Sequence, residues 1–105
     1  MAKIIITYRL KPGVTRGEHE TWTRTRDYPA MRGIARVESF VTHRTTRLLL
    51  DPDGKPSVDY IEVFDVPDLD GFMAEDFGSA SVQAILGEFM DRAEAPEIIV
   101  AEEVA

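Results

Sequence analysis

The segment from Ser57 to Val66 constrains the fold more than any other part of the sequence. It reads Ser-Val-Asp-Tyr-Ile-Glu-Val-Phe-Asp-Val and follows a Pro-Asp-Gly turn signal, and its β-branched and aromatic residues are typical of a strand. Alternation along the strand puts apolar side chains on both faces, which favours a central strand covered on both sides. Glu62 in its middle must find a partner, reach water near a sheet edge or line a cavity.

The remaining patterns predict helices and further strands on both sides of this segment. Thr15 and Glu18 form a capping-box pattern, and a helix is expected from about Arg16 to Asp27 with its end before Tyr28-Pro29. Apolar residues recur at helical spacing after Ser79 or Ser81 and predict a second helix that ends at Ala95-Pro96. The other expected elements are strands over residues 3–10, 37–50 and 97–104, a connector over 31–36 and a helical region that starts over 67–71.

The order of these elements is β-α-β-β-α-β, which predicts an α+β fold of the ferredoxin-like type. In that arrangement an antiparallel sheet carries its helices on one face. Isoleucine and valine occur at both parities in strands one, three and four, so the second face of the sheet also needs cover. We therefore expect a single domain over residues 1–105 that pairs with a second copy, sheet against sheet, as a dimeric α+β barrel.

The bulk composition excludes several classes of function. The chain has 105 residues, a formal net charge of -7 and no cysteine, so we expect no nucleic-acid partner, no disulfide and no thiolate chemistry. The apolar run at the N-terminus is too short for a signal peptide, and no segment approaches the ~20 apolar residues of a membrane span. We expect a cytoplasmic protein with no membrane partner.

The two histidines are the candidates for proton transfer near neutral pH. The sequence has no HExxH motif, no phosphate-binding glycine loop and no GxSxG motif, so no metal site or cofactor is expected. A metal held by the two histidines and a carboxylate is the less favoured alternative. Imidazole can take a proton from one atom and return it to another, which suffices for tautomerisation, cyclisation or elimination. His43 on a strand is the first candidate and His19 on a helix the second, with Glu62 or Asp27 orienting the imidazole. For each histidine a structural or surface role is the competing interpretation.

Aromatic and arginine side chains complete the predicted site. His19, Trp22 and Arg26 fall at i, i+3 and i+7 of the first helix and are expected to face inward, although Trp22 also fits an ordinary core position. Arg44 or Arg26 is the candidate to hold a substrate carboxylate. The predicted substrate-binding wall consists of Trp22, Tyr28, Tyr60, Phe77 and Phe89.

Several short motifs resemble the RedY-like (HapK-like) family of dimeric α+β barrel proteins. The motifs are Arg9-Leu-Lys-Pro-Gly-Val14, His19-Glu-Thr-Trp22, Asp27-Tyr-Pro29, Val37-Glu-Ser-Phe40, Arg44, Asp59-Tyr-Ile-Glu-Val63 and Asp65-Val66. The resemblance implies a homodimer with a small-molecule pocket between the sheet and helices of each subunit, and no metal or organic cofactor. It also implies a place in pathways to indole or pyrrole natural products, where some relatives act as cyclases that use histidine as acid and base. The chain departs from the family at positions 19 and 43, where tyrosine is usual.

Two other classes of function fit the same features. One is a non-catalytic carrier or pathway chaperone for a reactive intermediate. The other is a cofactor-independent oxygenase, which needs an electron-rich substrate that reduces O₂ itself. The leading hypothesis is a cyclase or isomerase that acts on a small aromatic or heteroaromatic substrate.

Overall fold

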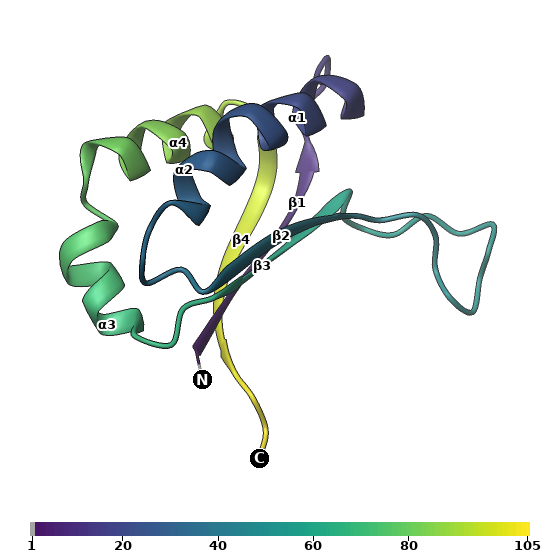
Figure 1. Ribbon diagram of the computed structural model, residues 1–105. Coiled ribbons are helices and arrows are strands. Elements are labelled where there is room, and N and C mark those ends of the chain that lie inside the picture. The colour runs from purple at the N-terminus through teal and green to yellow at the C-terminus, as the bar shows by residue number, and fades with distance from the viewer. Residues whose placement is uncertain (1) are drawn as a thin grey trace.

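A computed structural model describes residues 2–105 and contains a four-stranded antiparallel sheet with the helices on one face (Figure 1). The strands are β1 (Ala2–Leu10), β2 (Ser39–Arg44), β3 (Tyr60–Asp65) and β4 (Ala93–Glu102). They lie in the order β2-β3-β1-β4, and each neighbouring pair is antiparallel. The ferredoxin-like α+β prediction is confirmed, and β3 is a central strand as its composition indicated.

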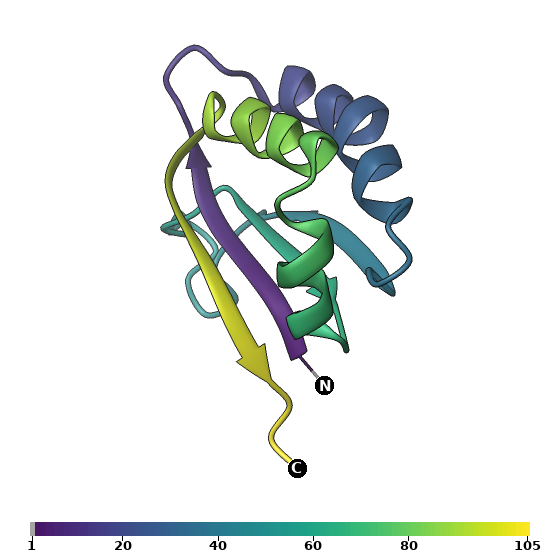
Figure 2. The same ribbon diagram turned by 90° about the vertical axis from the view of Figure 1, so that its left-hand side faces the viewer.

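The helices form two groups that cross the same face of the sheet (Figure 2). The first group is continuous and comprises α1 (Arg16–Trp22), the π-helical turn η1 (Thr23–Asp27) and α2 (Tyr28–Arg32). The second comprises α3 (Leu69–Gly71), the π-helical turn η2 (Phe72–Asp76) and α4 (Ala80–Met90). The Thr15 hydroxyl caps α1 and the Ser79 hydroxyl caps α4, as predicted. Among residues 2–105 no helix is long and apolar enough to cross a membrane.

The predicted end of the first helix before Tyr28-Pro29 is wrong, because a π turn carries the helix through the proline. The Tyr28 N–H donates to the Thr23 carbonyl, five residues back. Proline has no N–H to donate, and its ring clashes with the carbonyl four residues earlier in a regular α-helix. The wider π turn accommodates that ring, so the helix continues to Arg32 and the predicted connector over 31–36 begins inside it.

The π turn also changes which side chains face the sheet. His19, Trp22, Thr23 and Asp27 are buried. Arg26 was expected to share the inward face, but it is exposed and forms an ion pair with Glu88 of α4. The expectation for Arg26 is wrong because one extra residue in the turn delays the helix register, and Asp27 takes the inward position.

Two predicted strands have different bounds in the structure. The strand expected over 37–50 ends at Arg44, and residues 45–59 form a loop that projects from the body (Figure 1). The loop begins after Arg44, the last residue of β2 that pairs with β3. It contains two prolines, so no strand extends along it. The last strand begins earlier than expected, at Ala93, because a β-bulge accommodates Ala95, which has a φ of 51°, and the adjacent Pro96.

The two faces of the sheet differ in cover. The face under the helices carries the buried core, which includes Tyr8, Phe40 and Phe64. Within residues 2–105 no helix packs on the other face, which we call the bare face. Its apolar side chains are half-buried or exposed and comprise Ile5, Val41, Ile61, Val63 and Ile99.

Candidate functional site

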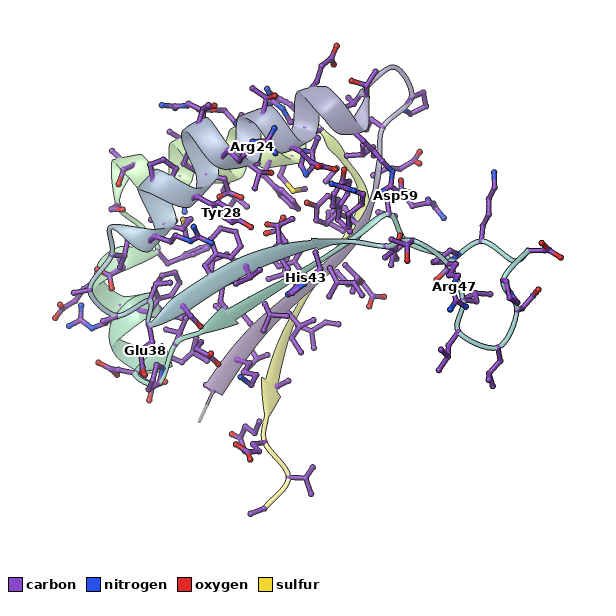
Figure 3. The ribbon with its side chains drawn as sticks, turned by 45° about the vertical axis from the view of Figure 1, so that its right-hand side comes forward. Arg24, Tyr28, Glu38, His43, Arg47 and Asp59 are labelled. Carbon is purple, nitrogen blue, oxygen red and sulfur yellow. The ribbon has the colours of Figure 1, made fainter. Side chains whose placement is uncertain are left out.

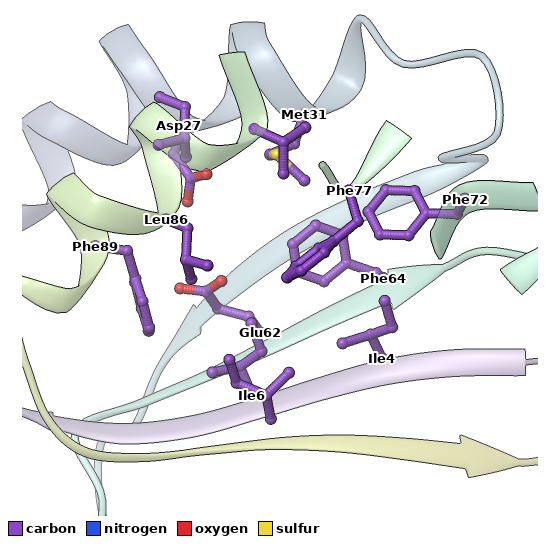
Figure 4. A pocket seen from close by; sticks show the side chains of 13 residues that line it. Ile4, Ile6, Asp27, Met31, Glu62, Phe64, Phe72, Phe77, Leu86 and Phe89 are labelled. Carbon is purple, nitrogen blue, oxygen red and sulfur yellow. The ribbon is translucent and has the colours of Figure 1, made fainter. Parts of the chain in front are cut away.

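An apolar cavity lies between the covered face of the sheet and the helices (Figure 4). Its volume is about 80 Å³, and its walls come from strands β1, β3 and β4 and from both helix groups, mostly from η2 and α4. Ile6, Phe64, Leu86 and Phe89 are typical of the lining, which is almost entirely hydrocarbon. The exceptions are two acidic side chains, Asp27 and Glu62, whose carboxyl groups both point into the space. A carboxyl in such surroundings strongly prefers its neutral form.

Glu62 is held from behind by a tyrosine. It lies in mid-strand on β3, opposite Ile6 of β1 and Thr42 of β2, and is 2% exposed. Its Oε2 accepts a hydrogen bond of 2.6 Å from the Tyr8 hydroxyl. Burial raises the pKa of Glu62 to about 8, and the nearby Asp27 carboxyl adds to the rise while the Tyr8 hydrogen bond opposes it. The sequence left three alternatives for Glu62, which were a partner, water near a sheet edge or a cavity. In the structure Glu62 lines the cavity.

Asp27 is the second carboxyl of the cavity and ends the π turn η1. It is 4% exposed, and no residue among 2–105 donates a hydrogen bond to its carboxyl group. Burial raises the pKa of Asp27 to about 7, the Arg32 guanidinium lowers it and Glu88 raises it. Asp27 and Glu62 are therefore two carboxyls at one end of an apolar space, and both exchange protons near neutral pH.

Behind Glu62, Tyr8 links the cavity to a buried histidine. The Tyr8 hydroxyl lies 2.7 Å from His19 Nε2, and neither residue has measurable exposure. The His19 ring lies between the indole of Trp22 and the ring of Tyr60. Burial lowers the pKa of His19 to about 4, and the charge of Arg92 contributes to the fall. His19 is therefore neutral at physiological pH and does not line the cavity.

The hydrogen count fixes the polarity of this chain of side chains. When Glu62 is ionised, Tyr8 gives its one hydroxyl hydrogen to Glu62, so the Tyr8 oxygen accepts from His19 and the hydrogen of His19 is on Nε2. His19 Nδ1 is buried and has no partner among residues 2–105, which suits a bare acceptor better than an N–H, because buried unpaired donors are rarer. The hydrogen bonds therefore run from His19 to Tyr8 to Glu62, and Glu62 Oε1 remains free to bind a ligand.

The predicted site residues fall into four places. Glu62, Asp27, Phe77 and Phe89 line the apolar cavity, and His19 reaches it through Tyr8. Tyr28, Arg44 and Tyr60 line a separate polar cavity under α1. Trp22 is buried in the core and donates to Glu88, which also binds the exposed Arg26.

His43 lies apart from all of these residues. It pairs with Ile61 in the β2–β3 register, and this parity places it on the bare face, where it is exposed (Figure 3). The structure therefore does not bring His43 together with Glu62, Asp27 or His19.

Tyr8 is the one member of the buried chain that sequence reasoning missed as a functional residue. Tyr8 shares the buried face of β1 with Ile4 and Ile6. A tyrosine on a core face needs a hydrogen-bond partner for its hydroxyl, and that requirement is the signal that could have pointed to Glu62 or His19. Among residues 2–105 no group of three His, Cys, Asp or Glu side chains is arranged to hold a metal ion.

Comparison with known proteins identifies the family. The model of the REDY-like protein HapK family matches residues 2–104. The chain belongs to this family. The crystal structure of HapK from Hahella chejuensis superposes with a TM-score of 0.78 at 24% identity and covers 99% of this chain and 93% of HapK. No curated protein matches the sequence significantly.

Two more distant structures share the fold. A hydroxynitrile lyase from Passiflora edulis has a TM-score of 0.77 at 14% identity, with 95% of this chain and 90% of the lyase covered. A dimeric ferredoxin-like protein of unknown function from Thermobifida fusca has a TM-score of 0.69 at 19% identity, with 97% of this chain and 90% of the Thermobifida protein covered. These structures show that the fold of this chain also occurs in proteins of low sequence identity.

Proposed function

We propose that the chain is a cofactor-independent enzyme of cyclase or isomerase type that moves protons on a small apolar, indole- or pyrrole-like substrate. The observation that carries this proposal is the pair Asp27 and Glu62 in the apolar cavity. Catalytic acids and bases need pKa values near the working pH, and those of Asp27 and Glu62 are raised to about 7 and about 8. Few solvent-exposed carboxyls meet that requirement.

The pair divides the work of one proton transfer. The carboxyl that has released its proton takes a C–H or N–H proton from the substrate, and its protonated neighbour returns a proton at a second atom. The bonding electrons stay on the substrate, so double bonds shift or a ring closes without an oxidant or reductant. The cavity of about 80 Å³ is smaller than the ~150 Å³ that holds benzene in an engineered protein interior, so the substrate must widen it next to Phe77, Leu86 and Phe89. The hydrocarbon of these three residues excludes water and keeps both carboxyl pKa values high.

His19 has a positioning role in this scheme. The sequence predicted a histidine as the group that exchanges protons with the substrate, but His19 is fully buried and its pKa is lowered to about 4. Its Nε2–H orients the Tyr8 hydroxyl, which then donates to Glu62 and stabilises the carboxylate that forms when Glu62 gives up its proton. The acid–base step thus belongs to carboxyls, and the imidazole acts through Tyr8.

Two comparisons support an enzyme in a dimer. One protein with this fold is named as a hydroxynitrile lyase, so the architecture is compatible with lyase chemistry. Another is described as dimeric, and an apolar bare face on a chain of this size suits pairing with a second copy. We include a homodimer, with a cavity in each subunit, in the proposal.

A non-catalytic carrier is the second candidate. At neutral pH both carboxyls retain protons for much of the time, because their pKa values are about 7 and about 8. Neutral carboxyls donate hydrogen bonds and could hold a nitrogen heterocycle without reacting with it.

Glu62→Gln separates the two candidates, because glutamine keeps the shape and hydrogen bonding but cannot exchange a proton. With a pathway intermediate as substrate, the enzyme predicts that Glu62→Gln retains binding and loses at least about 100-fold in kcat. Unchanged turnover in Glu62→Gln and in Asp27→Asn would contradict the enzyme and leave the carrier.

Tyr8→Phe tests the positioning chain. Loss of its hydrogen bond removes the contact that lowers the pKa of Glu62, so we expect the pH–rate profile to move to higher pH. A variant that only loosened the fold would lower the rate and leave the profile in place.

A further inference from the structure

A second cavity lies under α1 and η1, over the β2–β3 edge of the sheet. Its volume is about 210 Å³, and it is lined by Glu20, Thr23, Arg24, Tyr28, Thr42, Arg44 and Tyr60. None of these residues lines the apolar cavity. The Tyr60 ring stacks on Tyr8 at 5.6 Å and forms a wall between the polar cavity and the buried chain.

The one carboxylate of the polar cavity is already saturated. Glu20 Oε1 and Oε2 each accept a hydrogen bond of 2.8 Å from Arg44, and Oε2 accepts another of 2.7 Å from the Tyr60 hydroxyl. The Arg44 and Tyr60 hydrogen bonds lower the pKa of Glu20 to about 2, so it is ionised. Glu20 therefore balances Arg44 and has little capacity left for another donor.

The hydrogen-bond donors of this cavity exceed its acceptors. The Arg24 guanidinium forms no ion pair within residues 2–105, although its charge is near enough to lower the pKa of Glu20. Thr42 Oγ1 is buried and has no hydrogen-bond partner in the described chain. The Thr42 N–H is occupied, since it donates to the Tyr28 hydroxyl at 2.9 Å. With Arg24 and Arg44 against Glu20, the lining carries one net positive charge and unused donors.

We propose that this polar cavity binds the carboxylate group of a small aromatic acid. A guanidinium and a hydroxyl are the donors that carboxylate oxygens accept best in proteins. The rings of Tyr28 and Tyr60 supply two aromatic walls for the ring of the acid. The cavity is also larger than the ~150 Å³ that suffices to bind benzene in an engineered protein interior.

The position of Arg24 suits recognition of an incoming anion. The residue is exposed on η1, above Tyr28 (Figure 3), and both Arg24 and Thr42 of β2 line the cavity. An anion between them gains both partners at once. This site does not depend on the acid–base pair, because Arg24 and Thr42 line only the polar cavity.

Benzoate and benzamide provide the direct test, since they share a ring and differ in charge. Titration calorimetry of the full chain at low salt is expected to show saturable binding of benzoate at least 10-fold tighter than of benzamide. Binding should weaken as salt rises. Equal affinity for the two compounds, or no binding of benzoate, overturns the proposal. Tighter binding of inorganic phosphate than of benzoate overturns the assignment of the ligand as a carboxylate.

Two variants place the site. Arg24→Gln removes the free charge from an exposed position and is expected to weaken benzoate binding at least 10-fold. Thr42→Val removes only the buried hydroxyl and is expected to weaken it about 5-fold. Arg47→Gln is the matched control, because Arg47 lies on the projecting loop outside the cavity and should bind benzoate as the wild type does. If Arg24→Gln and Arg47→Gln bind benzoate equally, the ligand lies elsewhere and the proposal fails.

Discussion

One histidine lies on each side of the sheet, His19 on helix α1 above the covered face and His43 on strand β2 on the bare face, and their surroundings are opposite. Under the helices His19 is fully buried, bonded to Tyr8, and neutral because its pKa is lowered to about 4. On the bare face His43 is exposed beside apolar neighbours such as Val41 and Ile61. The same contrast holds for acids, since the carboxyl of Glu62 has its pKa raised while that of Asp65, on the other parity of β3, has its pKa lowered by Lys3.

The difference shows that helix cover, rather than residue type, creates the candidate acid–base site. Burial removes water, and the pKa values of Asp27 and Glu62 then move toward neutrality. The bare face has ionisable groups of the same kinds, but no helix shields them from water. Its apolar surface instead suits contact with a second copy of the chain.

The largest expected effect is on the bare face. Val63 lies at its centre, opposite Ile5 on β1 and Val41 on β2. If two bare faces meet in a homodimer, Val63→Lys buries an unpaired charge in each copy and should weaken association by about 4 kcal/mol, roughly a thousandfold in Kd. Sedimentation equilibrium measures this change. Ala84→Lys on the exposed side of α4 is the control and should leave the dimer intact. If the wild-type chain is a monomer, the pairing of bare faces is refuted.

A smaller effect is expected on the covered face, where stability should fall as pH rises from 6.5 to 8. A carboxyl whose pKa is raised by folding holds its proton in the folded chain after the unfolded chain has released it. Its stabilisation is complete below the ordinary pKa and is lost as pH rises toward the folded value. For Glu62 that value is about 8 and for Asp27 about 7. His19 acts in the opposite sense, but only below its ordinary pKa of ~6.5.

Urea unfolding at fixed protein concentration across this window checks the sign. The free energy of unfolding should drop by about 2 kcal/mol between pH 6.5 and pH 8. Glu62→Gln should flatten most of the slope, because glutamine does not titrate. A free energy that stays constant or rises over this range in the wild type would mean that the two carboxyls are not held neutral by the cavity.

The smallest effect is expected from the histidine on the bare face. His43→Ala removes an exposed side chain that forms no buried hydrogen bond, so the free energy of unfolding at pH 7 should change by less than about 0.5 kcal/mol. The pH–rate profile should also stay in place. A loss of turnover in His43→Ala comparable to that of Glu62→Gln would show that the bare face takes part in the chemistry.

Local pattern predicted much of the fold. The β-branched and aromatic residues around Glu62 correctly predicted β3 as a central strand. They did not show which parity is buried, because both faces carry apolar side chains. The Thr15 cap and the stripe that contains Val82 and Phe89 gave the two main helices. These features depend on neighbours a few residues apart, and such interactions can be read from the order of residues.

The site depended on longer-range geometry. Whether His43 faces the cavity is set by the β2–β3 register, which the long loop between the strands leaves open. The partners of Tyr8 lie 11 and 54 residues away, beyond any local signal. The inward turn of Asp27 required a π turn, whereas helical periodicity assumes regular winding. Sequence reasoning therefore selected Glu62, Asp27 and His19 as candidates but could not show how they meet.

The π turn has a consequence for the character of the interior. It presents Asp27 where an evenly wound helix would present its neighbour Arg26. One additional residue within a single helical turn thus decides whether an acidic or a basic side chain lies at this end of the apolar cavity. Removing that residue would exchange an acid for a guanidinium and convert a chamber suited to proton donors and bases into one that attracts anions.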